Sequence, residues 1–258
     1  VWCRLRRISL RIALRHHPFL ALLGLSLFSL NYLLFYYAAF ELATGLLAVI
    51  FSTMTVMNIF NSALFLRRQI QKKTVLAVVF GLTGMALVFW PEITTSGPQV
   101  ATAIGISLIA TYLASIGNIV SARNQNHGLP VASANAIGMA YGALFMLAYS
   151  AGSGVPFMID TSATYIGSLL FLALFASAIA FGCYLTLVER IGPENAAYAT
   201  VLFPIVALAL STWFEDYQWQ NSAIVGVGLI LIGNVMVLSQ PGLIRRLKAL
   251  SPRPQDNG

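Results

Sequence analysis

Long apolar runs separated by short polar loops make up most of this chain. Each run is about 18 to 25 residues long and shows no alternation of apolar and polar positions. A helix needs about 20 apolar residues to cross the hydrocarbon of a bilayer, whereas a barrel strand alternates over about 10. We therefore predict an all-α integral membrane protein with eight transmembrane helices. The predicted spans are 19–40, 44–66, 74–91, 99–122, 130–151, 164–188, 195–213 and 221–240.

The composition agrees with lipid as the main solvent. Hydrophobic residues make up 58% of the chain and charged residues only 9%, whereas a soluble domain carries about 25% charged residues. The net charge is +7, but the basic residues lie between the apolar runs. Anionic lipid headgroups are therefore the expected partner, and not nucleic acid. Cys3 and Cys183 are expected to be free thiols.

The basic residues also predict an orientation. All fifteen Lys and Arg residues fall in the first flank, in alternate loops or in the tail. The remaining loops contain acidic residues instead: Glu41, Glu92, Asp160, Glu215 and Asp216. Because basic loops stay cytosolic, we predict a multi-pass protein of the inner or plasma membrane with both ends in the cytosol.

A weak internal repeat runs through the chain. A shift of 149 residues lays spans one to three over spans six to eight without a gap, so that Ser62 falls on Ser211 and Gly84 on Gly233. Chance matching of leucine-rich helices is the alternative. Spans four and five have no counterpart, so we expect two helices before Val1 and ten in the intact protein. Five helices per repeat would place the two halves inverted in the membrane.

Several motifs in the last third of the chain resemble EamA-type permeases of the drug/metabolite transporter superfamily. They are residues 184–197, Leu202-Phe203-Pro204-Ile205-Val206-Ala207, Phe214-Glu215 and the glycines from Gly226 to Gly233. The resemblance implies two inverted five-helix repeats, with the first four helices of each repeat around the pathway. Residues 1–92 would then be the remainder of the first repeat, 99–240 the second repeat and 241–258 a cytosolic tail.

The first repeat departs from this pattern. Thr55 stands where Pro204 stands in the second repeat, and Leu66 stands where Glu215 does. The two expected N-terminal helices would supply part of the pathway, so whether residues 1–258 transport on their own is open.

Ionisable residues are confined to the edges of the predicted spans. This pattern argues against a membrane hydrolase, a metalloenzyme or a built-in proton relay, which need clustered ionisable groups. We expect no cofactor and no metal site, and His16 and His17 are expected to be solvated in the basic flank.

Uncharged polar residues form stripes on two spans. Thr55, Asn58 and Ser62 share one face of the second span. The fourth span carries a second stripe of four residues: Ser107, Thr111, Ser115 and Asn118. Such residues either join helices by hydrogen bonds or line a pathway. Several tyrosines lie deep in the spans, where an amphipathic ring suits a partly apolar solute.

The candidate substrate-binding residues are Asn31, Tyr32, Asn58, Tyr112, Asn118, Asn135, Tyr184 and Tyr198. Pro204 is predicted to lie inside a helix, as a hinge or as a static kink. Gly138 and Gly142 predict close helix packing.

Together these features predict a secondary transporter that exports small organic metabolites by alternating access. Its partners would be a small-molecule substrate and the lipid bilayer, and a homodimer is possible. The direction of transport rests on the family resemblance. The alternatives are a membrane-embedded enzyme, which needs a catalytic polar cluster, and a non-catalytic membrane partner protein, which needs a large extramembrane domain.

Overall fold

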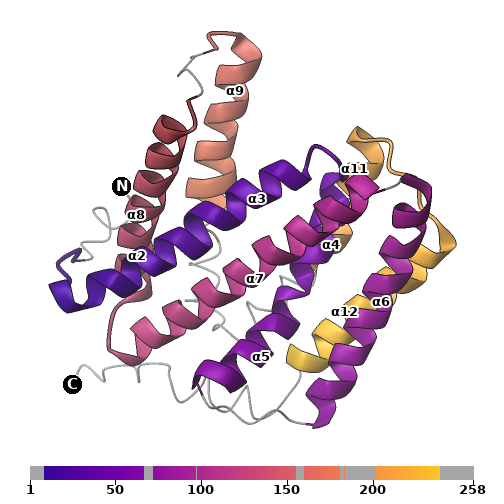
Figure 1. The fold of residues 1–258 in the computed structure, drawn as a ribbon, viewed down its shortest axis with the longest axis horizontal. Coiled ribbons are helices and arrows are strands. Elements are labelled where there is room, and N and C mark those ends of the chain that lie inside the picture. Colours follow the sequence, from indigo (N-terminus) through magenta and orange to yellow (C-terminus); the bar gives the residue numbers. More distant parts are fainter. Residues whose placement is uncertain are drawn as a thin grey trace, which may run out of the picture.

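The computed structural model describes residues 9–66, 72–96, 98–154, 160–180, 183 and 202–238, and within these ranges it is a helical bundle without strands (Figure 1). This architecture confirms the predicted fold class. The elements are η1 (Leu14–His16), α2 (His17–Leu25), η2 (Ser26–Leu30), α3 (Asn31–Ala38), α4 (Thr44–Ser52), α5 (Met54–Leu66), α6 (Lys72–Ser96), α7 (Pro98–Asn126), α8 (Val131–Gly152), α9 (Ala163–Phe171), η3 (Leu172–Ile179), α11 (Phe203–Phe214) and α12 (Asn221–Leu238).

Apolar helices occupy all eight predicted spans. Four helical stretches are long and apolar enough to cross a membrane: Leu14–Ala38, Thr44–Leu66, Pro98–Asn126 and Val131–Gly152. Shorter apolar helices fall in the other four spans, at Val75–Pro91, Ala163–Phe175, Phe203–Phe214 and Asn221–Val237. Parts of the predicted sixth and seventh spans lie outside the described residues. The ten-helix arrangement stays a prediction.

Two of the spans contain irregular helix. The first span includes the π-helical segment η2, and the sixth includes the π-helical segment η3. The second span is broken between α4 and α5, where the Ser52 hydroxyl donates to Val49 O (2.7 Å) and the Thr53 hydroxyl donates to Ile50 O (2.6 Å). Hydroxyls that bond back to the preceding turn compete with the helix and bend it. The break places the start of α5 at Met54, near the middle of this span.

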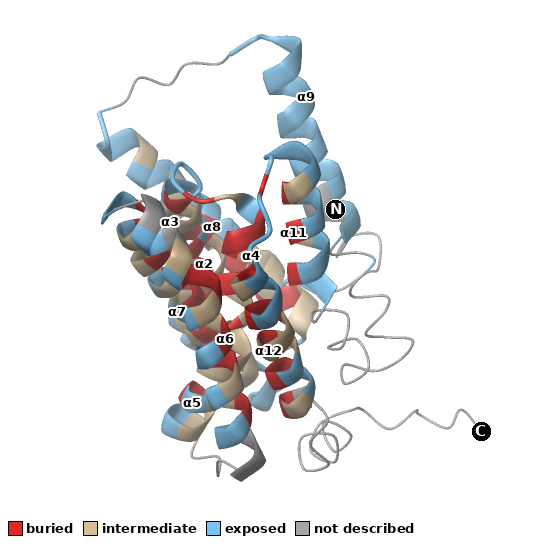
Figure 2. Cartoon of the chain, turned by 90° about the vertical axis from the view of Figure 1, so that its right-hand side faces the viewer, coloured by how far each residue is buried: buried red, intermediate tan, exposed pale blue. Residues whose placement is uncertain are grey.

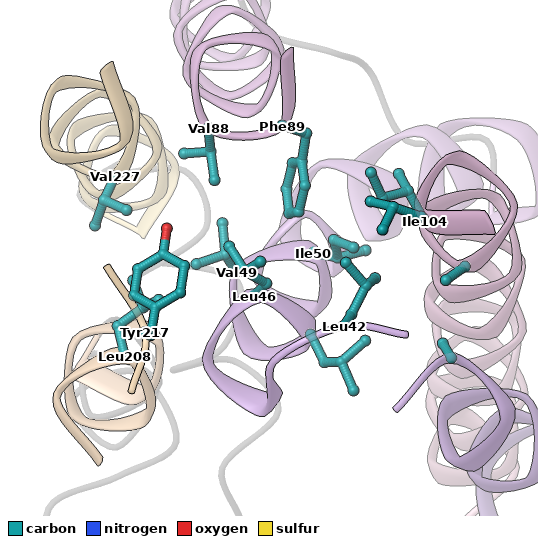
Figure 3. Packing of buried hydrophobic residues seen from close by; sticks show 14 of the residues in the cluster. Leu42, Leu46, Val49, Ile50, Val88, Phe89, Ile104, Leu208, Tyr217 and Val227 are labelled. Atoms are coloured by element: carbon teal, nitrogen blue, oxygen red, sulfur yellow. The ribbon is translucent and has the colours of Figure 1, made fainter. Parts of the chain in front are cut away.

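The largest apolar cluster surrounds α4. Its side chains Leu46, Val49 and Ile50 pack against α6, α7, α11 and α12 (Figure 3). The labelled partners in that view are Val88, Phe89, Ile104, Leu208 and Val227. In contrast, α9 is exposed along its length (Figure 2). Because α4 contacts helices from both ends of the sequence, this short helix ties the first three spans to the last two.

Glycines allow two pairs of helices to touch through their backbones. A Cβ atom on Gly226 of α12 would lie 2.5 Å from Gly84 O of α6, and one on Gly233 would lie 2.8 Å from Ala77 O. Residue numbers rise on one helix as they fall on the other, so α6 and α12 are antiparallel. A Cβ atom on Gly142 of α8 would similarly lie 3.0 Å from Gly24 O of α2. This contact confirms the close packing predicted for Gly138 and Gly142.

The two adjacent histidines are packed against other helices, which corrects the expectation of a solvated flank. His16 is only 7% exposed, and its ring centroid lies 6.1 Å from that of His127. The Nδ1 atom of His17 lies 2.8 Å from Tyr141 Oη on α8. The physical reason is that helix begins at Leu14, before the predicted start of the span, and carries both rings against the bundle.

Replacing Gly226 with alanine is expected to destabilise the α6–α12 contact. The added methyl group would lie 2.5 Å from Gly84 O and 2.7 Å from Val88 Cγ2, and overpacking of this kind costs about 1–3 kcal/mol. The melting temperature of the purified protein in detergent should fall. Gly228→Ala is the matched control, because a Cβ there meets no atom within 4 Å. Equal melting temperatures for the two variants would contradict the packing described here.

Candidate functional site

The polar stripes of the second and fourth spans meet at the break between α4 and α5. The Nδ2 atom of Asn118 on α7 lies 3.4 Å from Asn58 Oδ1 and 3.3 Å from Met54 Sδ. Both asparagines are only partly buried. The structure therefore brings two of the predicted site residues together, beside the first turn of α5.

A second polar contact joins the same helices further along α5. The Nδ2 atom of Asn61 donates to Ser115 Oγ at 2.8 Å, and both side chains are buried. The sequence placed Asn61 on the second span but did not single it out. Its spacing of three residues from Asn58 puts the two on neighbouring parts of one helix face, and this spacing was the available signal.

The two contacts differ in a way that separates helix packing from ligand binding. The Asn61–Ser115 distance is that of an ordinary short hydrogen bond, whereas 3.4 Å between Asn118 and Asn58 lies beyond the usual 2.7–3.2 Å range. A side-chain amide offers two donor hydrogens and an acceptor oxygen. The long Asn58–Asn118 contact therefore leaves donor and acceptor capacity on both amides that a bound solute could use.

Two further predicted asparagines contain buried oxygens without a hydrogen-bond partner among the described residues. They are Asn31 Oδ1 on α3 and Asn135 Oδ1 on α8. An unsatisfied buried acceptor costs about 1–3 kcal/mol. In the described part of the chain, neither residue is hydrogen-bonded to the Asn58–Asn118 pair. They are separate polar positions within the bundle.

Among the described residues, neither Tyr32 nor Tyr112 is hydrogen-bonded to the Asn58–Asn118 pair. Tyr32 is 46% exposed and Tyr112 is 44% exposed, while Tyr184 and Tyr198 lie outside the described residues. Pro204 is buried, but it occupies the first turn of α11 and not the helix interior as predicted. A proline fits the first turn without removing a helical hydrogen bond, so no kink is required there. Its role as a hinge stays a prediction.

In the part of the chain that the structure describes, no charged side chain is hydrogen-bonded to Asn58 or Asn118, and no cluster of three or more His, Cys, Asp or Glu could bind a metal ion. The chemistry available at this contact is hydrogen bonding by amides together with apolar and thioether contact. Such groups suit reversible binding of a small solute.

Comparison with known proteins decides the family. The model of the EamA-like transporter family matches residues 1–90 and 101–239. The chain belongs to the EamA-like transporter family. This result confirms the resemblance noted in the motifs of the last third.

Two relatives agree with the EamA assignment. A Clostridium kluyveri protein described as an uncharacterized transporter is 22% identical over 237 residues, which cover 90% of this chain and 76% of the relative. Protein PagO of Salmonella typhimurium is 22% identical over 230 residues, which cover 89% of this chain and 74% of the relative. EamA membership indicates a multi-pass membrane transporter.

A double-mutant cycle should distinguish the two polar contacts in this EamA protein. Asn61→Ala and Ser115→Ala are expected to couple by about 0.6 kcal/mol, a typical value for a hydrogen bond between membrane helices. Asn58→Ala and Asn118→Ala should show coupling near zero, because their contact is long. The measurement is the free energy of unfolding of single and double variants in mixed micelles. Coupling that is larger for Asn58–Asn118 than for Asn61–Ser115 would refute this assignment.

Proposed function

We propose that this chain is a secondary transporter that exports small organic metabolites by alternating access. The loosely paired amides of Asn58 and Asn118, next to the break between α4 and α5, are the observation that carries the proposal. Substrate sites of secondary transporters lie near the middle of the membrane, where helices are discontinuous. The amides would bind the solute by hydrogen bonds, without covalent chemistry.

Alternating access needs two halves that move against each other, and the glycine contacts support such halves. Gly84 touches Gly226, and Ala77 touches Gly233. Under the 149-residue shift, Gly84 corresponds to Gly233 and Ala77 corresponds to Gly226. The repeat therefore relates the Gly84–Gly226 contact to the Ala77–Gly233 contact. Contacts that exchange in this way are expected at a two-fold axis. For touching antiparallel helices that axis runs across them, which supports repeats inverted in the membrane.

The irregular helix segments support the same relation. The first helical residues Met54 of α5 and Phe203 of α11 are 149 positions apart. The segment η2, shifted by 149, covers 175–179 and falls within η3. The family model also matches the chain in two segments, 1–90 and 101–239. Helix breaks and π segments are places where a backbone can change direction, so we assign to them the bending that alternating access requires.

The substrate class follows from the groups at the proposed site. Amides bind both donors and acceptors, and Met54 adds a soft apolar contact. A small uncharged or zwitterionic metabolite, amino-acid-like or drug-like, matches these groups better than a multiply charged one, because no charged side chain of the described residues is hydrogen-bonded to this pair. We further propose that both ends of the chain lie in the cytosol, because the loops on that side are basic.

Export by the intact protein, including any residues that precede Val1 in its natural form, tests the proposal. Cells that overexpress it should accumulate a small set of metabolites in the medium, seen by untargeted mass spectrometry. Removing two hydrogen-bonding amides with Asn58→Ala/Asn118→Ala should reduce this accumulation about tenfold or more, since each lost bond is worth about 1 kcal/mol.

The matched control is Asn126→Ala/Asn221→Ala, which removes the same two amides from exposed positions at helix ends. The control should export like the parent at equal membrane abundance. If the parent is abundant and inserted but no metabolite accumulates outside, the export proposal fails.

A further inference from the structure

One carboxylate joins α4 to α11 at the end of the bundle where the acidic loops lie. The backbone N–H of Thr44 donates to Glu215 Oε2 at 2.8 Å, and the Thr44 hydroxyl donates to Glu215 Oε1 at 2.7 Å. The Ser211 hydroxyl donates a third, short hydrogen bond to Glu215 Oε2. Both carboxylate oxygens are therefore engaged, and two of the three bonds cross between the helices.

Glu215 lies at the end of α11, but its charge is favourable because of the neighbouring helix α4. Glu215 is the C-cap residue of α11, and a negative charge is unfavourable at the C-terminal end of its own helix. The N-terminus of α4 has no side-chain cap of its own, because its N-cap residue is Ala43. Glu215 supplies that cap from the other half of the chain, and its charge lies where the helix dipole favours an anion.

Glu215 itself is exposed, but α4 and α11 pack closely next to this contact. A Cβ atom on Gly45 would lie 2.9 Å from Leu208 Cα and 2.9 Å from Ser211 Cβ. Burial raises the pKa of Glu215, but the hydrogen bonds from Ser211 and Thr44 lower it by more, so that the pKa lies below its ordinary value of 4.5. The group is ionised at neutral pH, which is the form that accepts all three bonds.

The internal repeat does not supply the residues for this contact a second time. A shift of 149 residues places Leu66 at the position of Glu215 and Pro193 at the position of Thr44. The leucine side chain has no acceptor for a hydrogen bond, and proline has no backbone N–H to donate. The two ends of the bundle therefore differ, because only the acidic-loop end has the groups for this carboxylate contact.

We propose that the Glu215–Thr44–Ser211 contact is a one-sided clamp that holds α4 against α11 and favours the conformation closed at the acidic-loop end. This inference rests on the alternating-access function proposed above. Without substrate, the protein would rest closed at the acidic-loop end and open towards the end with the basic loops. Movement to the other state would have to break the clamp.

Thiol labelling measures closure at this end without any substrate. Leu46 of α4 is buried against the apolar cluster, so Leu46→Cys is the reporter, in a background with Cys3→Ser and Cys183→Ser. A membrane-impermeant maleimide is added to intact cells, where the acidic-loop end faces outward in the proposed topology. Glu215→Gln replaces one acceptor oxygen with a donor amide that faces the donors of Thr44 and Ser211, so labelling should be about tenfold faster.

Two further variants sharpen the test. Glu41→Gln removes the same charge from an exposed loop position next to α4 and should label like the parent. Thr44→Val removes one of the three bonds and should label at an intermediate rate. Thr44→Val also decides the matter if Glu215→Gln does not give a monodisperse folded protein. Unchanged labelling in Glu215→Gln or in a folded Thr44→Val, or an equal increase in Glu41→Gln, would overturn the clamp.

The labelling and export experiments can fail independently. Faster labelling without any exported metabolite would support the clamp and count against the transport function. Export with unchanged labelling would support transport and overturn the clamp.

Discussion

Water is absent from the hydrocarbon core of a bilayer, so every polar group of a spanning helix needs a partner within the protein or a solute that serves as one. The chain meets this constraint in different ways along its length. The hydroxyls of Ser52 and Thr53 donate hydrogen bonds to carbonyls of the preceding turn, and the Asn61 amide donates to Ser115 on α7. Asn58 and Asn118 reach each other only at 3.4 Å. This incomplete pairing, next to the break between α4 and α5, is what separates the Asn58–Asn118 contact from the Asn61–Ser115 contact.

The same constraint explains why the architecture was predictable and the site was only partly so. Span length and the distribution of Lys and Arg are local properties, so eight apolar helices could be predicted from the sequence. The stripes on the second and fourth spans also indicated that Asn58 and Asn118 either join helices or line a pathway. Which asparagine forms a tight bond depends on the register of α5 against α7, and no local pattern contains that register. The sequence therefore could not rank Asn61 against Asn58.

The predictions that were wrong also depended on contacts and helix boundaries that a local pattern does not contain. His16 and His17 were expected in solvent because they lie in a basic flank, but His17 meets Tyr141, 124 positions away. Pro204 looked like a residue of the helix interior because the apolar run begins earlier, whereas α11 begins at Phe203. The break at Thr53 was not anticipated, since a Ser-Thr pair in an apolar run is compatible with a continuous helix until its hydroxyls turn inward.

Under the proposed mechanism, the contacts between the two halves have different roles. The glycines of α6 and α12 bring two backbones together in a contact that the repeat maps onto itself, so this contact can persist while the halves tilt. The Glu215 clamp has no counterpart under the repeat, so it would exist in one conformation only. The symmetric α6–α12 contact would hold the two halves together in both conformations, and the asymmetric Glu215 contact would favour one of them. The transporter would then have a defined resting state.

Transport of solutes across a membrane by this EamA-family protein can be tested in vesicles that contain no other protein. Purified intact protein would be reconstituted into liposomes loaded with a metabolite extract, and the external solution would be followed by mass spectrometry. A few small uncharged or zwitterionic compounds should leave these vesicles faster than they leave protein-free vesicles, while the rest of the extract stays inside. Identical release from both kinds of vesicle, with the protein folded and inserted, would contradict a transport function.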